Sequence, residues 1–281
     1  MSAVDAALTV ARAHGLPTER ARVLRDVTNV IVHLEPAPVV ARVARVFGGR
    51  ERARLQVELA HHGAALGAPV AAPSDLLPPG PHEVEGMLVT FWRWYDHDRD
   101  RPLDARNGGR TLRELHEAFA SFPGRMPVYA DERELGSLLD RHEVNGVDVE
   151  VLRRGLEEVN AERLPGPPVH GDAHLGNTLR TPDGRFWWVD LEGACRAPRE
   201  YDLAANRWAE ISWPDRPPFA HELLEGYGDY DADVLDRMVV AHALWNTVWT
   251  LELARLQPLP SVLAICKQRV GWWRKRYALE M

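Results

Sequence analysis

Residues 169–179, VHGDAHLGNTL, gather side chains that can do chemistry. In an extended strand His170, Asp172 and His174 would point to one face, as the ligands of a metal-dependent hydrolase can. The spacing from Asp172 to Asn177 equally matches a phosphotransferase catalytic loop, where the carboxylate accepts a hydroxyl proton and the amide oxygen binds Mg²⁺. A third interpretation is a loop whose polar side chains only satisfy backbone groups. The segment alone leaves all three open.

A second carboxylate follows at the end of WWVDLE, where Asp190 lies thirteen residues after Asn177. The intervening TPDG is a strong turn signal, so we expect a β-hairpin that brings Asn177 and Asp190 to one cation. A metal-dependent hydrolase would instead need further ligands from positions that no motif marks. The neighbourhood therefore favours phosphoryl transfer. Asp202, in PREYDLA, lies at the start of a predicted helix, where capping explains it equally well.

HGDAHLGN followed by VDLEGACRAPREYDLA resembles the aminoglycoside phosphotransferase-like family of small-molecule kinases. The order of elements extends the resemblance from about residue 23 to the end. It implies a protein-kinase-like fold and transfer of the γ-phosphoryl group of ATP or GTP, with Mg²⁺, to a small-molecule hydroxyl. By the same resemblance Asp172 is the catalytic base, Asn177 and Asp190 are the metal ligands, and His170 and Asp202 are structural supports.

The elements that must position these residues fall into two groups. A helix, three short β-branched strands, a helix over ERARLQVELAHHGAAL and a further strand fill residues 1–95. Beyond them the pattern is mostly helical. We expect an α+β protein with two lobes: a nucleotide-binding lobe with a small antiparallel sheet over residues 1–95, and a helical lobe with the catalytic loop and substrate site over residues 96–281.

The resemblance also implies a lysine on the third strand, paired with a glutamate on the following helix, to hold the nucleotide phosphates. The first lysine of the chain is Lys267, and Arg42 stands at the strand position. Glu58 matches the helix glutamate. The alternative for Arg42 is an ordinary solvent-facing strand residue.

We expect the nucleotide base against the connector between the lobes. It would use backbone groups from Phe91 through Trp92 to Arg93, with Thr90 behind it. Core packing explains the aromatic residues there equally well.

A glycine-rich loop is missing between the first two strands, LRDVTNVIVHLE. Asp26, Thr28 and Asn29 would have to make the bend. This departure, together with Arg42, motivates an alternative function: a nucleotide-binding pseudokinase that serves as an interaction module.

The charge and cysteine content of the chain limit the kinds of partner that it can bind. The 281 residues carry a net charge of -7, and residues 96–281 hold thirty-two acidic against twenty-four basic side chains. No concentrated basic face appears, so we do not expect nucleic-acid binding. Two cysteines and the lack of a signal-peptide pattern or of a long apolar run predict a cytoplasmic protein that makes no membrane contact.

The acceptor is marked only weakly. Six acidic residues in HELLEGYGDYDADVLD would attract a cationic substrate such as an aminoglycoside if they border the cleft, although a solvated helix junction explains them too. Trp245 and Trp249 would line a substrate pocket or form a buried helix face. The acidic residues are Glu222, Glu225, Asp229, Asp231, Asp233 and Asp236.

Overall fold

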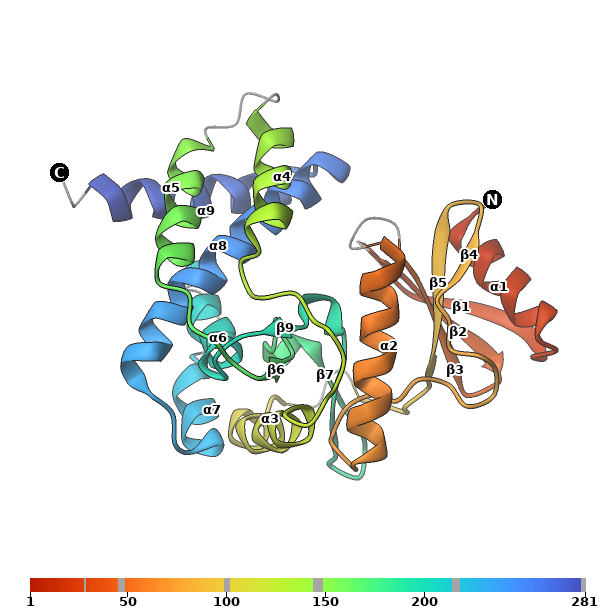
Figure 1. The fold of residues 1–281 in the computed structure, drawn as a ribbon. Helices are drawn as coiled ribbons and strands as arrows, with labels where there is room; N and C mark the ends of the chain where they lie inside the picture. The colour runs from red at the N-terminus through yellow and green to blue at the C-terminus, as the bar shows by residue number, and fades with distance from the viewer. Residues whose placement is uncertain (28, 45–48, 99–101, 144–148, 214–217, 279–281) are drawn as a thin grey trace.

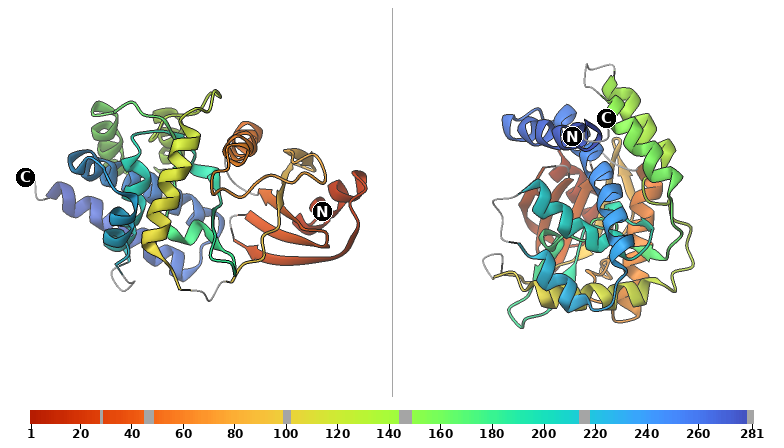
Figure 2. Two further views of the ribbon diagram at one scale, coloured as in Figure 1. Left: turned by 90° about the horizontal axis from the view of Figure 1, so that it is seen from below. Right: turned by 90° about the vertical axis from the view of Figure 1, so that its left-hand side faces the viewer.

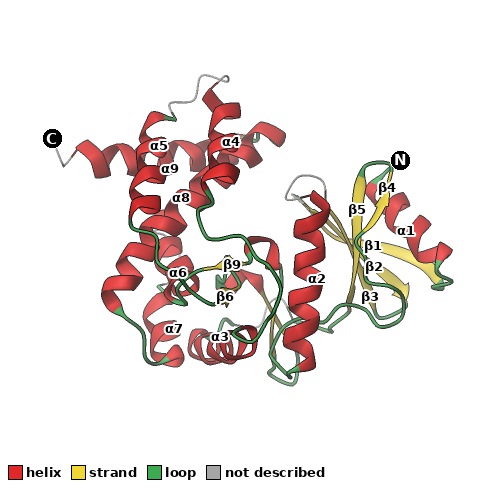
Figure 3. Cartoon of the chain, in the orientation of Figure 1, coloured by secondary structure: helices red, strands yellow, loops and turns green. Residues whose placement is uncertain are grey.

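The computed structural model describes the whole chain except residues 28, 45–48, 99–101, 144–148, 214–217 and 279–281. A lobe built on a β-sheet holds the N-terminus, and a lobe built mainly of helices holds the C-terminus (Figure 1). Figure 3 shows this division by colour, with the five-stranded sheet confined to the first lobe. The order of sheet and helices expected from the sequence is confirmed.

The sheet of the N-terminal lobe is antiparallel, with strand order β1-β2-β3-β5-β4. Helix α1 packs against the sheet through small residues, and its first turn carries a capping box between Ser2 and Asp5. The core of this lobe is formed by inward-facing valines, Leu34 and Phe91. The elements are α1 (Ala3–Ala13), β1 (Thr18–Asp26), β2 (Asn29–Pro36), β3 (Val39–Ala44), β4 (His82–Val84) and β5 (Met87–Arg93).

Helix α2 (Gly49–Ala65) lies between the sheet and the helical lobe (Figure 2). Its Leu59 and Ala60 are fully buried, and they belong to the core cluster of the C-terminal lobe. Gly67 follows with a φ of 79°, a conformation that ends helices readily. The chain therefore passes between the two cores before the connector, and the boundary near residue 95 stays a prediction.

The C-terminal lobe packs its helices around one large core that includes Trp188, Tyr201 and Trp273. Two short β-ladders, β6 with β9 and β7 with β8, carry the polar motifs between α5 and α6. None of the helices in the described ranges is both long and apolar enough to cross a bilayer. The elements are α3 (Ala105–Phe119), α4 (Glu132–Glu143), α5 (Glu150–Ala161), β6 (Pro168–Val169), β7 (Thr178–Arg180), β8 (Phe186–Trp188), β9 (Cys195–Arg196), α6 (Glu200–Ser212), α7 (Ala220–Tyr227), α8 (Ala232–Leu256) and α9 (Pro260–Ala278).

Candidate active site

The loop after β6 is held in place by Asp202, which is completely buried at the start of α6. Its Oδ2 accepts a hydrogen bond of 2.8 Å from the backbone N–H of His170, and its Oδ1 accepts one of 2.7 Å from Gly171. His116 of α3 donates to the same carboxylate at 2.8 Å. Burial alone would raise the pKa of Asp202, but the hydrogen bond and charge of His116 outweigh it and lower that pKa. Asp202 thus sits where its expected supporting role requires.

Gly171 lets the loop approach the neighbouring turn closely. Its φ is 84°, and a Cβ at this position would lie 1.8 Å from the carbonyl oxygen of Gly193. A side chain would therefore push apart the two segments that carry Asp172 and Asp190.

His170 is engaged on both ring nitrogens. Nε2 lies 2.9 Å from the Val189 carbonyl oxygen, and Nδ1 lies 3.3 Å from the backbone nitrogen of Asp172. His174 turns its Nδ1 to the backbone N–H of Gly176. The extended strand that would align His170, Asp172 and His174 as metal ligands is therefore wrong, because the loop turns back on itself. In the parts of the chain that the structure describes, no three His, Cys, Asp or Glu side chains converge on a common metal position.

Asp172, Asn177 and Asp190 come together as the hairpin predicts. Nδ2 of Asn177 donates to the backbone oxygen of Asp172 at 3.0 Å and to its Oδ2 at 3.3 Å. The β7–β8 hairpin continues through a 3.0 Å hydrogen bond from the Val189 N–H to the Asn177 carbonyl, which places Asp190 beside the loop. Oδ1 of Asp172 and Oδ1 of Asp190 are buried and accept no hydrogen bond from the described residues. Such carboxylate oxygens suit a hard cation, so this donor set fits Mg²⁺.

Arg42 reaches the same place from β3. Its side chain is only 8% exposed, and Nη2 lies 3.1 Å from Oε2 of Glu192 and 3.5 Å from Oδ1 of Asp190. Burial opposes its charge, but the two carboxylates more than compensate and raise the pKa of Arg42. Burial also raises the pKa of Glu192, despite the nearby guanidinium. Arg42 is therefore a buried cation of the interlobe site, which excludes the solvent-facing alternative.

The expected pairing of Arg42 with Glu58 is wrong. Glu58 is 45% exposed on α2 and pairs with Arg54 at 2.6 Å. Gln56, two residues earlier, is buried and faces the interlobe cleft. Two residues correspond to about 200° around a helix, so the side of α2 that meets the cleft carries Gln56 and not Glu58.

The connector residues divide between the cleft and the core. Trp92 and Arg93 line the cleft, whereas Thr90 and Phe91 are buried outside its lining. The Phe91 N–H donates to the Pro79 carbonyl at 2.9 Å, and its own carbonyl accepts from the Ser74 N–H at 2.9 Å. The expected adenine contacts from the Phe91 backbone are therefore not available. Thr90 Oγ1 accepts from the Trp92 indole N–H at 2.9 Å, which places Thr90 behind the connector.

The cleft between the lobes has a volume of about 630 Å³, within the range of small-molecule sites. The sheet contributes an apolar wall, and the opposite lobe contributes the hairpin and its polar residues. Tyr95 and His97 extend the lining beyond the residues expected for the connector. The sheet side of the wall includes Leu24, Ile31 and Val40.

The turn between β1 and β2 contacts the C-terminal lobe. Nδ2 of Asn29 donates to Oε2 of Glu192 at 3.3 Å, and Nε2 of Gln257 donates to the Val27 carbonyl at 2.7 Å. Asp26 ends β1, while Thr28 lies outside the described residues. The glycine-free turn thus reaches the site through Asn29.

The acidic segment serves the helix junction. Asp231 caps α8 by accepting from the backbone N–H groups of Asp233 and Val234, and Glu225 pairs with Arg106 of α3. Helix α7, which carries Glu225, packs against α3 on the side of α3 that faces away from the sheet in Figure 1. None of the six acidic residues lines the interlobe cleft, so of the two interpretations the solvated helix junction is the one that the structure supports.

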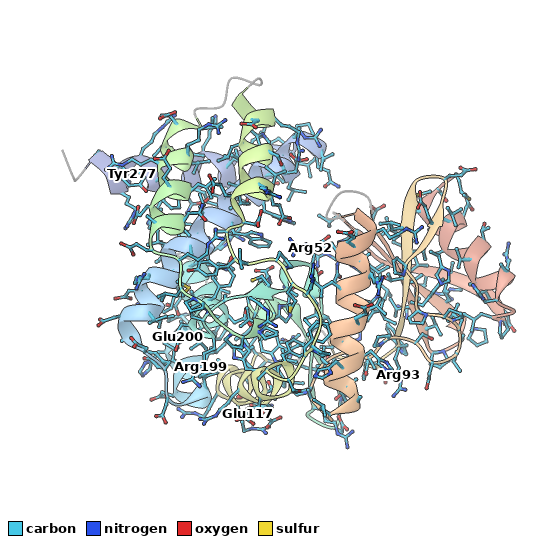
Figure 4. All side chains as sticks on the ribbon, viewed as in Figure 1. Arg52, Arg93, Glu117, Arg199, Glu200 and Tyr277 are labelled. Atoms are coloured by element: carbon cyan, nitrogen blue, oxygen red, sulfur yellow. The ribbon has the colours of Figure 1, made fainter. Side chains whose placement is uncertain are left out.

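Trp245 and Trp249 lie elsewhere, with ring centroids 6.5 Å apart. Both are half-buried and line a small cavity at the interlobe side, together with Arg52, Glu134 and Glu192. Arg52 projects from α2 toward the C-terminal lobe in Figure 4, where it pairs with Glu134 at 2.5 Å. Neither indole lines the interlobe cleft, so a role for them in a substrate pocket stays a prediction.

Two further side chains, Glu192 and His242, border the candidate active site, although the sequence analysis did not identify them. Glu192 follows Asp190 by two residues in the VDLE motif, so the sequence already indicates that it lies close to Asp190. Its ion pair with Arg42 could not be predicted from the sequence. His242 of α8 places Nε2 3.8 Å from Oδ1 of Asp172. Burial lowers the pKa of His242 to about 4, although the Asp172 charge opposes the shift. No sequence pattern connects α8 to the catalytic loop.

Comparison with known proteins gives one family match. Residues 18–238 match the family model described as "Phosphotransferase enzyme family". An uncharacterized protein of Deinococcus radiodurans is 27% identical over 165 residues, a match that spans 51% of this chain and 48% of that relative.

Solved structures share the fold over nearly the whole chain. A choline/ethanolamine kinase family protein from Mesorhizobium loti is 20% identical with a TM-score of 0.65, covering 96% of this chain and 93% of its own. APH(2")-IIIa in complex with GDP and kanamycin is 15% identical with a TM-score of 0.63, covering 98% and 99%. A microcompartment-associated aminopropanol kinase is 17% identical with a TM-score of 0.63, covering 97% and 98%. These likenesses confirm the two-lobed kinase-like fold.

Proposed function

This chain belongs to the phosphotransferase enzyme family, and on that premise we propose that it transfers the γ-phosphoryl group of ATP or GTP to a hydroxyl group of a small molecule. The observation that carries the proposal is the meeting of Asp172, Asn177, Asp190 and Arg42 at one place between the lobes. A base, two metal-binding oxygens and a phosphate cation are the parts that phosphoryl transfer needs.

Asp172 would act as the general base. Its Oδ2 is oriented by Asn177, whereas its buried Oδ1 accepts no hydrogen bond from the described residues. The Asp172 side chain is 21% exposed, so the carboxylate can be reached by the acceptor hydroxyl and can accept its proton as the hydroxyl oxygen attacks phosphorus. Asp202 and His170 would keep the loop rigid, so that the base needs little reorganisation during the reaction.

Asn177 and Asp190 would hold the Mg²⁺ that accompanies the nucleotide. Because Asn177 turns its amide nitrogen to Asp172, its amide oxygen faces away from that carboxylate. When bound, the ion would neutralise charge on the phosphates. Arg42 would bind phosphate oxygens from the opposite lobe, with a fork suited to two oxygens at once.

For the nucleotide base we propose the apolar part of the cleft beside Trp92 and Arg93. The acceptor would be a hydroxyl compound carrying an amine, such as an aminoglycoside or an amino alcohol. The support for it is the nature of the structural relatives, one of which was solved with kanamycin and another of which is an aminopropanol kinase.

Binding and transfer test the proposal in sequence. Calorimetric titration with ATP and with GTP, each with and without Mg²⁺, should show metal-dependent binding, and a screen of amino alcohols and aminoglycosides should then show phosphate transfer. Asp172→Asn should lower kcat by about a hundredfold or more at nearly unchanged nucleotide affinity, because the carboxylate acts on the acceptor. Asp183→Asn, on the exposed hairpin turn, is the matched control.

Two results would contradict the proposal. No nucleotide binding under either condition removes the kinase function. Binding without transfer to any acceptor, with Asp172→Asn indistinguishable from wild type, would favour the nucleotide-binding pseudokinase instead.

A further inference from the structure

Glu192 contacts two separate elements of the N-terminal lobe. Its Oε2 lies 3.1 Å from Nη2 of Arg42 on β3 and accepts a 3.3 Å hydrogen bond from Asn29, where β2 begins. Glu192 itself lies in the short 3-10 turn that follows Asp190. One carboxylate therefore links the proposed phosphate cation and the β1–β2 turn to the loop proposed to bind the metal.

Helix α2 does not offer Arg42 a carboxylate. Its two acidic residues, Glu51 and Glu58, are exposed, and Gln56 is the α2 side chain that lines the cleft. A buried guanidinium is costly unless a carboxylate stays beside it. Glu192 meets that requirement, with its own side chain only 13% exposed.

We propose that Glu192 is the positioning residue of Arg42 and takes the place of a glutamate on the helix after β3. It holds the guanidinium toward the nucleotide phosphates and keeps Asn29, at the end of the β1–β2 turn, against the same loop. This inference rests on the proposed function, because Arg42 has phosphates to bind only if the cleft takes a nucleotide.

The arrangement has a mechanical consequence. Glu192 and Asp190 lie two residues apart on one turn of the C-terminal lobe, whereas Arg42 and Asn29 belong to the sheet. Arg42 is therefore correctly placed only when the lobes are together. Phosphate binding and the approach of the lobes become one event.

The test compares MgADP affinity, measured by calorimetry, in matched interlobe variants. Glu192→Gln should weaken binding about tenfold, because the guanidinium loses the nearer of its two carboxylates and is held less firmly in place. Glu134→Gln is the control: it removes a 2.5 Å ion pair with Arg52, also between the lobes, that does not involve Arg42. Its MgADP affinity should stay within about twofold of wild type, since Arg42 keeps its partner.

A double-mutant cycle tests whether Glu192 acts through Arg42. In an Arg42→Ala background, Glu192→Gln should weaken MgADP binding by less than about twofold further. A full tenfold loss in that background would mean that Glu192 acts independently, for instance on the metal, and would overturn the inference. Wild-type affinity in Glu192→Gln, or an equal loss in Glu58→Gln, would overturn it as well.

A conservative variant covers the risk that Glu192→Gln disturbs the fold. Glu192→Asp keeps the charge on a shorter stem, so its MgADP affinity should fall between those of wild type and Glu192→Gln. In steady-state kinetics both variants should raise the KM for nucleotide and leave the KM for the acceptor unchanged.

If the proposed function itself is wrong, the wild type will bind no MgADP, and the role of Glu192 must then be tested without a nucleotide. If the wild type binds no MgADP, the Arg42–Glu192 pairing is read from the thermal midpoints of the same wild-type, single and double variants. Non-additive midpoints would support the pairing, and additive midpoints would overturn it.

Discussion

Acidification should destabilise this protein through His242. The imidazole is 1% exposed, and burial lowers its pKa to about 4, although Asp172 and Asp202 oppose the shift. The unfolded chain takes up a proton near pH 6.5, whereas the folded protein resists it until about pH 4. The stability contributed by the neutral imidazole is therefore complete above pH 6.5 and is lost as the pH falls. With these two pKa values, the linkage relation gives a loss of about 2 kcal/mol by pH 5 and about 3 kcal/mol by pH 4.

Urea unfolding at pH 7.5 and pH 5.0 measures this loss. Wild type should lose about 2 kcal/mol more than His242→Gln between the two conditions, because glutamine has no proton to gain. Buried His142 and His33 add to the acid sensitivity of both proteins, so the difference isolates His242. His221→Gln, at an exposed position of α7, controls for the substitution. Equal losses in wild type and His242→Gln, or an imidazole that titrates near pH 6.5 by NMR in the folded protein, would refute the reasoning.

Three further predictions concern the site. Asp190→Ala should weaken MgATP binding and leave metal-free ATP binding nearly unchanged, since it deletes a metal-binding oxygen; equal MgATP affinity in variant and wild type would contradict that role. Asp202→Asn should lower the free energy of unfolding by about 3 kcal/mol in urea, because it removes a buried carboxylate that His116 and two loop N–H groups share; a change below about 0.5 kcal/mol would show that the pair is dispensable. Arg42→Lys should raise the KM for ATP without lowering the melting temperature, because a lysine cannot span Glu192 and the phosphates with one forked group; unaltered kinetics would mean that only the charge matters.

The sequence determined the chemical content of the site. Asp172, Asn177 and Asp190 are joined by a loop and a hairpin, both of which close through local hydrogen bonds. Their proximity therefore follows from spacing and from the TPDG turn. The succession of a small sheet and a helical lobe was likewise readable from periodicity, because apolar spacing reports directly which face of an element is buried.

Contacts between distant elements were beyond such reasoning. His116 and His242 come from α3 and α8, and nothing in their local sequence states that they meet Asp202 and Asp172. The acidic residues of α7 and α8 were visible as a cluster, yet only the packing of α7 on α3 decided that they lie away from the cleft.

Arg42 shows the difference between what the sequence determines and what only the tertiary structure determines. Its position on a strand that faces the cleft is local information, and the sequence supplied it. Its partner depends on the rotation of α2 about its own axis and on how closely the two lobes approach. A turn of about 200° separates Gln56 from Glu58, and the packing of Leu59 and Ala60 against the C-terminal core decides which of the two faces inward. Many weak apolar contacts, summed over both lobes, set that rotation, so only the tertiary structure could place Glu192 and not Glu58 beside the guanidinium.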